Sequence, residues 1–172
     1  MLLDRLLNII RPQLIDGVTF SVNTDDGSKS IGEKRNEIIA GCPSAQYISM
    51  IDDDDLVTTD YVSRIAKALE QSPDCVGLEG IWNTDGKYTK QFTHSIRYRK
   101  LIVTKTAYFR SPTHINPIKR EIAVRCPFPH ISHGEDAYFS KKVFPLLKTE
   151  VFLENPLYFY EYSTTNPFRV IK

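Results

Sequence analysis

Apolar residues at the start of the chain recur at steps of three and four. They are Leu2, Leu3, Leu6, Leu7, Ile10 and Leu14. This spacing places them on one helical face, so the chain is expected to open with a helix. A second stripe predicts a helix with Thr59 as its cap and Pro73 after its end, and consists of Tyr61, Val62, Ile65, Ala66 and Leu69. Further helices are expected from Gly32 to Ala40 and from Gly134 to Leu147.

Shorter apolar runs lie between these helices and predict strands. Residues Val18–Asn23 alternate between apolar and polar side chains, whereas Tyr47–Ile51 and Cys75–Trp82 are nearly continuous apolar runs. Further strands are expected at Gln91–His94, Leu101–Thr104 and Val151–Glu154, followed by an aromatic run at Tyr158–Tyr162. Because strands alternate with helices, we expect an α/β fold. No linker rich in Gly, Ser or Pro divides the chain, so residues 1–172 are interpreted as one domain.

The composition is that of an ordinary globular domain, with 41% hydrophobic and 25% charged residues among 172. A chain of this length buries roughly 70% of the surface that its unfolded form exposes, so it needs no disulfide or structural metal. Its three cysteines form no CxxC pair, which argues against a disulfide framework or a zinc site.

Positive and negative charges are nearly balanced. The chain has 22 Lys and Arg against 21 Asp and Glu, so its net charge of +1 gives no long-range attraction to nucleic acid or to an anionic membrane. No apolar run approaches the length of about 18 residues that a membrane span needs. Asp4 and Arg5 interrupt the region where a signal peptide would be apolar. We therefore expect a cytoplasmic protein without a membrane span.

The strongest chemical feature is the acidic run Asp52–Asp55, directly after the predicted strand Tyr47–Ile51. Adjacent carboxylates repel one another, and a divalent cation that prefers oxygen ligands, Mg²⁺ or Mn²⁺, relieves that repulsion. Ligands in α/β sheets collect at the carboxyl ends of strands, which is where this run lies. The alternative is that Asp54 and Asp55 face solvent and favour the positive end of the following helix.

A second acidic pair, Glu135 and Asp136, follows Gly134 at the start of a predicted helix. Carboxylates in a first helical turn are stabilised by the helix dipole, so simple capping explains the pair and is favoured on spacing alone. A catalytic role requires Asp136 to face a cleft, where it accepts a proton from a substrate hydroxyl.

A third group follows the predicted strand Val18–Asn23. Asp25 and Asp26 form a turn with the next glycine, and Lys34 and Arg35 lie in the helix after it. Such residues are usually solvated. At the carboxyl end of a strand, however, a Lys or Arg can bind a phosphate group of a ligand, and an Asp can hydrogen-bond its base or ribose. The chain has no HExxH, GxSxG, GxxxxGK[ST] or GxGxxG motif, which disfavours a zinc hydrolase, a serine hydrolase, a P-loop enzyme and a Rossmann enzyme.

In chain order, these motifs resemble those of family 2 glycosyltransferases with the GT-A fold. They are DDGS at Asp25–Ser28, GEKRN at Gly32–Asn36, YISMIDDDD at Tyr47–Asp55 and HGED at His133–Asp136. The resemblance covers most of the chain and is strongest from residue 17 to residue 72. It implies a mixed central sheet flanked by helices, and an enzyme that moves a sugar from a nucleotide sugar to an acceptor hydroxyl with inversion.

The resemblance also implies roles for individual residues. Asp25 or Asp26, with Lys34 or Arg35, would bind the nucleotide of the donor, and Asp52 would lie near its ribose. Asp52 and Asp54 match the paired carboxylates of the DxD motif, and Asp54, together with Asp55, would hold Mn²⁺ or Mg²⁺ on the diphosphate. Asp136 matches the catalytic base, with Glu135 beside it. The acceptor would be a saccharide, a lipid-linked sugar, a protein or a modified nucleobase.

The sequence departs from the family at its start, because family members begin with a strand and this chain begins at the first helix. The first strand is therefore expected to be missing, so the strands at Val18–Asn23 and Tyr47–Ile51 either pair directly or expose unpaired edges, and exposed edges favour self-association. Either the start is truncated, or the sheet closes differently, or the domain is a non-catalytic binding module. The rival enzyme class is a nucleotidyltransferase, which also uses carboxylate-held metal.

Overall fold

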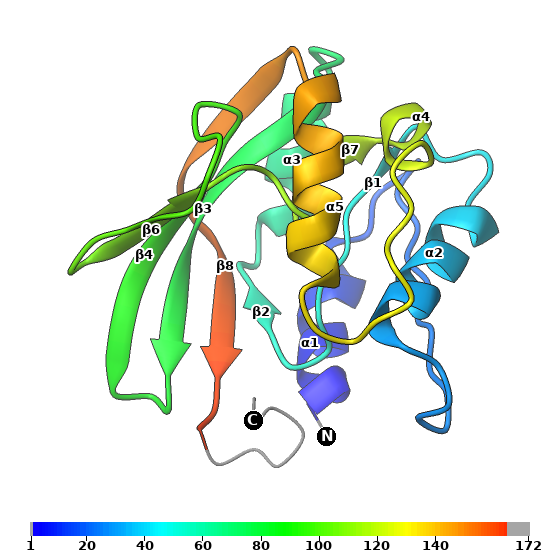
Figure 1. Ribbon diagram of the computed structural model, residues 1–172. Coiled ribbons are helices and arrows are strands. Elements are labelled where there is room, and N and C mark those ends of the chain that lie inside the picture. Colours follow the sequence, from blue (N-terminus) through cyan, green and yellow to red (C-terminus); the bar gives the residue numbers. More distant parts are fainter. Residues whose placement is uncertain (1, 165–172) are drawn as a thin grey trace.

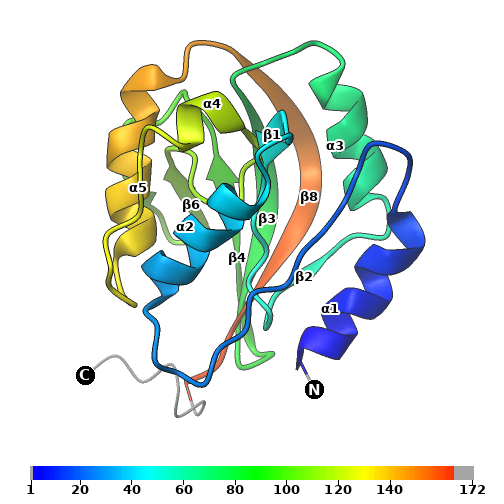
Figure 2. The same ribbon diagram turned by 90° about the vertical axis from the view of Figure 1, so that its right-hand side faces the viewer.

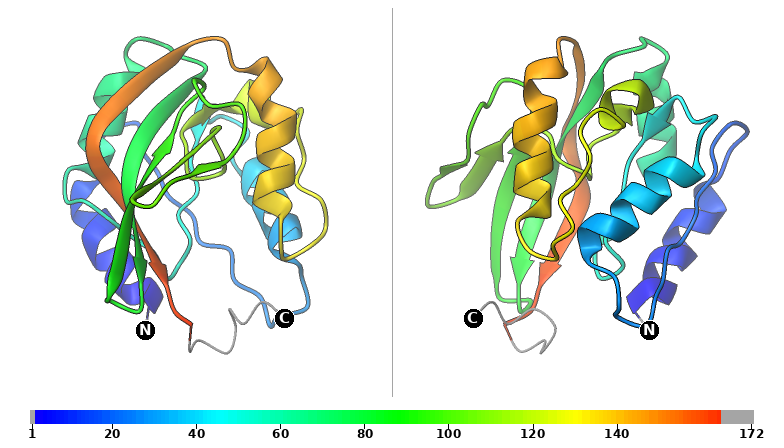
Figure 3. Two further views of the ribbon diagram at one scale, coloured as in Figure 1. Left: turned by 60° about the vertical axis from the view of Figure 1, so that its left-hand side comes forward. Right: turned by 45° about the vertical axis from the view of Figure 1, so that its right-hand side comes forward.

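The computed structural model describes residues 2–164, and its centre is a mixed β-sheet (Figures 1 and 2). The strands are β1 (Tyr47–Ile48), β2 (Leu56–Val57), β3 (Cys75–Thr84), β4 (Tyr88–His94), β5 (Ile102–Val103), β6 (Ala107–Arg110), β7 (Ile118–Lys119) and β8 (Glu150–Tyr162). β3 pairs with β8 in parallel along its length, a pairing that Figure 3 shows from two sides. β4 is antiparallel to β3, and β6 is parallel to β4. β7 joins the start of β3 and pairs with β1, while β2 pairs with β8.

Helices cover the sheet in two groups. The helices are α1 (Leu2–Ile10), α2 (Ile31–Gly41), α3 (Tyr61–Leu69), α4 (Arg120–Ala123) and α5 (Glu135–Val143), with 3-10 turns η1 (Arg11–Gln13) and η2 (Phe144–Leu146). In Figure 2, α1 and α3 lie on one side of β8, and α2, α4 and α5 lie on the other. Each group has its own buried cluster of side chains, one around Leu6, Ile65 and Tyr158 and the other around Ile39, Phe139 and Val143.

The predicted helices are confirmed, with small shifts at their ends. The first continues into a 3-10 turn at Arg11–Gln13, and α5 continues into one at Phe144–Leu146. At the start of α2, Ser30 and Glu33 form a reciprocal capping box that satisfies two backbone N–H groups. The prediction that Thr59 caps α3 is wrong, because Asp60 is the residue that precedes the helix and no side-chain cap is formed there.

The predicted strand at Val18–Asn23 is wrong. In the described chain this segment is irregular and pairs with no strand, and the sheet ends at β1 on that side. Phe20 and Val22 are 41% and 48% exposed, so the alternating pattern finds no sheet on which to bury its apolar face. The strand predicted at Tyr47–Ile51 is paired only at Tyr47–Ile48, antiparallel to β7.

The two patterns at Val151–Glu154 and Tyr158–Tyr162 belong to one long strand, β8. Its register against β3 shifts near Glu79, where the Asn155 backbone has a positive φ of 68° and the Asn155 N–H donates to the Glu79 carboxylate. A bulge of this kind breaks the alternation of side chains, which is why the sequence pattern looks like two segments. All three cysteines are free, as expected. No helix within residues 2–164 has the length and apolar character to cross a membrane.

A buried histidine on β4 gives a test of this packing. His94 bonds Asn116 over 3.1 Å, and burial, with the positive Arg110 nearby, lowers the pKa of His94 to about 3. In the unfolded chain this histidine takes up a proton below about pH 6.5 that the folded protein excludes. The free energy of unfolding therefore loses the His94 contribution as the pH falls from about 6.5 toward 3.

We expect His94→Gln to show a smaller fall in unfolding free energy between pH 6.5 and pH 4 than the parent, because Gln stays neutral in both states. Urea denaturation at a series of pH values measures it. His130→Gln is the matched control, since the His130 side chain is 70% exposed. An equal pH dependence for His94→Gln and the parent would contradict the lowered pKa assigned to His94.

Candidate active site

Arg35 of α2 connects the acidic run to the start of α5. Its side chain is only 6% exposed. Nη2 donates to Asp52 Oδ1 over 2.8 Å, and Nη1 donates to Glu135 Oε1 over 2.7 Å. The structure thus brings together residues from three of the four sequence motifs, which lie up to 100 positions apart.

Asp52 lies where the chain leaves β1 and turns toward β2. Its Oδ2 is 3.4 Å from Nε2 of His114, and the same nitrogen is 3.1 Å from Nη2 of Arg35. Burial opposes ionisation of Asp52, but His114 and Arg35 together hold the pKa of Asp52 below its usual range. Asp52 therefore contributes a fixed negative charge at the edge of the sheet.

Asp55 is buried against β8, where the Tyr158 hydroxyl contacts both its carboxylate and the Asp52 N–H. It is 1% exposed, and its carboxylate accepts hydrogen bonds from the Tyr158 hydroxyl over 2.7 Å and from the Glu161 N–H over 3.0 Å. Burial raises the pKa of Asp55 to about 8, and the negative charge of Asp52 acts in the same direction. In this geometry Asp55 fastens the acidic turn to β8. Asp54 stands between them, half-buried in the turn that the Asp55 N–H closes onto the Asp52 carbonyl.

Asp136 lies in the first turn of α5 and pairs across to β6. Its Oδ2 accepts from Arg110 Nη1 over 3.1 Å, and although burial opposes ionisation, Arg110 and His114 hold the pKa of Asp136 below its usual range. Gly134 allows this placement, because the chain enters the helix through a left-handed backbone with φ 81°. This ion pair joins the start of α5 to β6, so Asp136 makes a contact beyond its own helix, and its catalytic role stays a prediction.

Asp25, Asp26 and Lys34 lie around the loop before α2. Asp25 Oδ1 accepts from Lys34 Nζ over 2.9 Å, and Asp25 Oδ2 accepts from the Lys29 N–H over 2.7 Å. Asp26 accepts from the Ser28 N–H over 3.1 Å. Hydrogen bonds from the Lys29 N–H and then from Lys34 lower the pKa of Asp25, and hydrogen bonds from Ser28 lower the pKa of Asp26. The third sequence cluster is therefore a structured, negatively charged loop, with Lys34 as its partner.

Sequence reasoning missed Arg110 and His114. Both lie between residues 88 and 125, where short strands and two prolines give no clear periodicity. In the structure His114 is unusual because its Nδ1 is buried and has no hydrogen-bond partner among the described residues.

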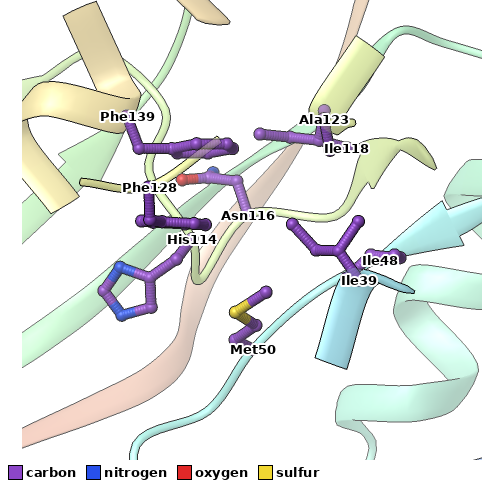
Figure 4. A pocket seen from close by; sticks show the side chains of 9 residues that line it. All are labelled: Ile39, Ile48, Met50, His114, Asn116, Ile118, Ala123, Phe128 and Phe139. Atoms are coloured by element: carbon purple, nitrogen blue, oxygen red, sulfur yellow. The ribbon is translucent and has the colours of Figure 1, made fainter. Parts of the chain in front are cut away.

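A cavity of about 10 Å³ lies beside His114, and Figure 4 shows its lining. The lining is almost wholly apolar and consists of Ile39, Ile48, Met50, His114, Asn116, Ile118, Ala123, Phe128 and Phe139. This volume is near the minimum for a single water molecule, so the cavity cannot hold a nucleotide.

No protein-family model and no curated protein sequence matches the chain. Among solved structures, it is similar to S. aureus TarS residues 1–349 in complex with UDP-GlcNAc, with a TM-score of 0.72 and 13% identity, covering 99% of this chain and 57% of that one. A structure of TarS 1–349 alone gives a TM-score of 0.65 and 12% identity, covering 92% and 56%. A further TarS structure gives 0.67 and 14%, covering 92% and 34%.

The chain thus spans a little over half of TarS 1–349 and about a third of the longest of these TarS chains. At such low identity the likeness shows the fold alone. TarS is a family 2 glycosyltransferase with the GT-A fold, so the prediction of a GT-A-like α/β fold with a central mixed sheet is confirmed.

The acidic residues fit a metal only if the donor supplies part of its ligand shell. Within residues 2–164 no three His, Cys, Asp or Glu side chains converge as they would around a metal ion. Mg²⁺ bound with a nucleotide needs one or two carboxylates, because phosphate oxygens and water complete the shell. In the turn at Asp52–Asp55, Asp54 is partly exposed whereas Asp55 is only 1% exposed, so Asp54 is the more accessible of these two carboxylates.

Proposed function

We propose that the protein is a metal-dependent inverting glycosyltransferase that moves a sugar from a nucleotide sugar to an acceptor hydroxyl. The observation that carries the proposal is the Arg35 bridge, since one buried guanidinium holds both the acidic turn and the start of α5. It joins Asp52, which we assign to the donor side, to Glu135, the residue directly before the proposed base Asp136. The likeness to TarS, crystallised with UDP-GlcNAc, supports the proposal and suggests a UDP-sugar as the first donor to test.

The proposed reaction uses two acidic residues, Asp136 as the base and Asp54 as the metal ligand. Asp136 accepts the proton of the acceptor hydroxyl, and the oxygen attacks the anomeric carbon on the face opposite the diphosphate. The bond from the anomeric carbon to the diphosphate breaks in the same displacement, which inverts the configuration. A Mg²⁺ or Mn²⁺ held by Asp54 would supply neutralising charge for the departing diphosphate. Arg110 orients Asp136 and keeps it ionised before the proton is transferred.

The remaining residues bind the donor or hold the residues that bind it. We assign Asp25, Asp26 and Lys34 to the nucleotide side of the site, and Asp52 to the ribose. Arg35 is buried and already bonded to Asp52 and Glu135, so its role in donor binding is to hold Asp52 in place. Glu135 is the partner of that bridge and does not itself take the acceptor proton.

Asp54→Ala is expected to abolish Mn²⁺-dependent binding of UDP and to leave the fold intact. Removing one of several adjacent carboxylates relieves repulsion, so the stability of the free protein stays level or rises slightly. Titration calorimetry with UDP, with and without Mn²⁺, measures the binding. Asp53→Ala is the matched control, because Asp53 is an exposed residue of the same turn. Undiminished binding by Asp54→Ala would remove Asp54 from the metal site.

A non-catalytic nucleotide-binding module is the second candidate, favoured by the unpaired and partly exposed segment Val18–Asn23. Incubation with a nucleotide sugar, Mn²⁺ and water or a sugar acceptor separates the two, because only an enzyme releases nucleoside diphosphate. A parallel incubation with a nucleoside triphosphate detects the nucleotidyltransferase alternative through released pyrophosphate. The cytoplasmic location and self-association both remain predictions.

A further inference from the structure

Four aromatic side chains form a continuous surface on the central sheet. They are Trp82 of β3, Tyr108 of β6, and Tyr160 and Tyr162 of β8, and we call them the aromatic patch. Trp82 is at its centre, with ring centroids 4.2 Å from Tyr160, 5.5 Å from Tyr108 and 5.8 Å from Tyr162. Each ring is only partly buried.

The β8 side of the aromatic patch continues the wall of the candidate active site. Trp82 lies opposite Tyr160, and two residues earlier Gly80 lies opposite Tyr158. Alternate residues of a strand point to the same face, so Tyr160 shares a face with Tyr158, which donates to Asp55. Two residues along a strand span about 7 Å. The aromatic patch therefore begins one step beyond the residue that fastens the acidic turn.

The β6 side of the patch leads to Asp136. Tyr108 and Arg110 are two residues apart on β6 and share a face, opposite Phe92 and His94 of β4. Arg110 is the residue that binds Asp136. An acceptor whose hydroxyl reaches Asp136 thus has the aromatic patch as the adjoining surface.

Cross-strand aromatic pairs also stabilise sheets, so stacking alone does not show a binding surface. A second observation, the position of the aromatic patch on the sheet, supports a binding surface. The ends of β3 and β8 extend beyond α5 in Figure 1, and the patch residues keep part of their surface exposed there, whereas Leu78 and Tyr158 nearer the centre are fully buried. The patch is therefore the partly uncovered continuation of a face whose inner part carries the site.

Resting on the proposed glycosyltransferase function, we propose that the aromatic patch is the acceptor platform and that the acceptor it takes is an uncharged saccharide. A sugar ring has one face of C–H groups that packs on aromatic rings, and the tyrosine hydroxyls provide partners for its hydroxyls. Lys90, which lies opposite Trp82 on β4, is already held over the Tyr108 ring at 4.8 Å and bonded to the Thr104 carbonyl. A polyanionic acceptor such as RNA needs several free cations, so the charge of this surface favours a neutral ligand.

The only tryptophan of the chain is Trp82, so its fluorescence reports directly on the aromatic patch. We would titrate the protein with neutral trisaccharides built from N-acetylglucosamine, glucose or galactose, in the presence of Mn²⁺ and UDP. At least one is expected to give a saturable change in emission, and Tyr108→Leu is expected to weaken its binding by up to about tenfold. Phe109→Leu is the matched control, because Phe109 is the next residue of β6 and packs against Tyr98 on the other face.

Binding of UDP and Mn²⁺, measured by calorimetry in the same variants, separates this inference from the proposed function. UDP binding without any saccharide response would overturn the acceptor platform and leave the glycosyltransferase proposal standing. A response to single-stranded RNA or to detergent-solubilised lipid, with none to trisaccharides, would also overturn it. A saccharide response that Tyr108→Leu and Phe109→Leu weaken equally would place the saccharide elsewhere. Saccharide binding with no UDP binding and no transfer would leave the aromatic patch as a saccharide-binding surface, but it would overturn both its acceptor role and the proposed enzyme.

Discussion

Replacing Asp136 by Asn is expected to slow sugar transfer by about a hundredfold to ten-thousandfold, the usual loss when a general base is removed. Binding of UDP and Mn²⁺ should be nearly unchanged, because the amide has almost the same shape and its oxygen still accepts a hydrogen bond from Arg110. The amide cannot take the proton of the acceptor hydroxyl. The loss should therefore fall on kcat, with little change in the KM for the donor.

Steady-state kinetics with varied donor and saturating acceptor measures this effect. Asp60→Asn is a matched control, since Asp60 is an exposed aspartate beside the start of α3 that makes no side-chain cap. It should transfer sugar at the parent rate. If Asp136→Asn did the same, Asp136 would be only a partner of Arg110 at the end of a helix.

Replacing Arg35 by Met is expected to lower the free energy of unfolding by about 3–5 kcal/mol. The guanidinium lies between Asp52 and Glu135, and without it the buried Glu135 loses its cationic partner while Asp52 keeps only its contact with His114. Arg35→Lys should recover only part of the loss, because a single ammonium cannot reproduce a fork that bonds two partners. Transfer activity should fall in both variants.

Urea denaturation of the two variants beside the parent measures the stability. Lys34→Met is the matched control, because Lys34 is the adjacent residue of α2 and its side chain is 27% exposed against 7% for Arg35, so the loss should stay below about 1 kcal/mol. The double variant Arg35→Met with Glu135→Gln should regain stability relative to Arg35→Met, since one of the stranded charges is gone. A loss below about 1 kcal/mol for Arg35→Met would mean that the bridge adds no stability.

The sequence predicted the helices and the acidic turn well because their signals are local. The periodic stripe of α3 and the run at Asp52–Asp55 can be recognised without knowing what lies across the sheet. The prediction of a strand at Val18–Asn23 was wrong for the opposite reason. Alternation indicates that one face of a segment is apolar, but it does not indicate that a neighbouring strand is present to pair with it. Arg110 and His114 were missed because an ion pair between distant segments leaves no spacing pattern in the chain.

Asp55 illustrates the same limit at a single residue. Its neighbours made it look like one more metal ligand, and nothing in the local sequence distinguishes it from Asp54. Its contacts with Tyr158 and Glu161, more than 100 residues later, give it a structural position in the wall of the sheet. Four adjacent aspartates can therefore have different environments, which long-range packing decides.

The parallel pairing of β3 with β8 sets the order in which the site is assembled during synthesis. β8 is the last helix or strand along residues 2–164, and it donates hydrogen bonds to Asp55 from the Tyr158 hydroxyl and the Glu161 N–H. Parallel neighbours so far apart in sequence pair slowly, because a long loop must close before any contact forms. On the ribosome, α1, α2 and the acidic turn therefore emerge well before the strand that contacts Asp55, and the candidate active site is completed only after β8 has been synthesised.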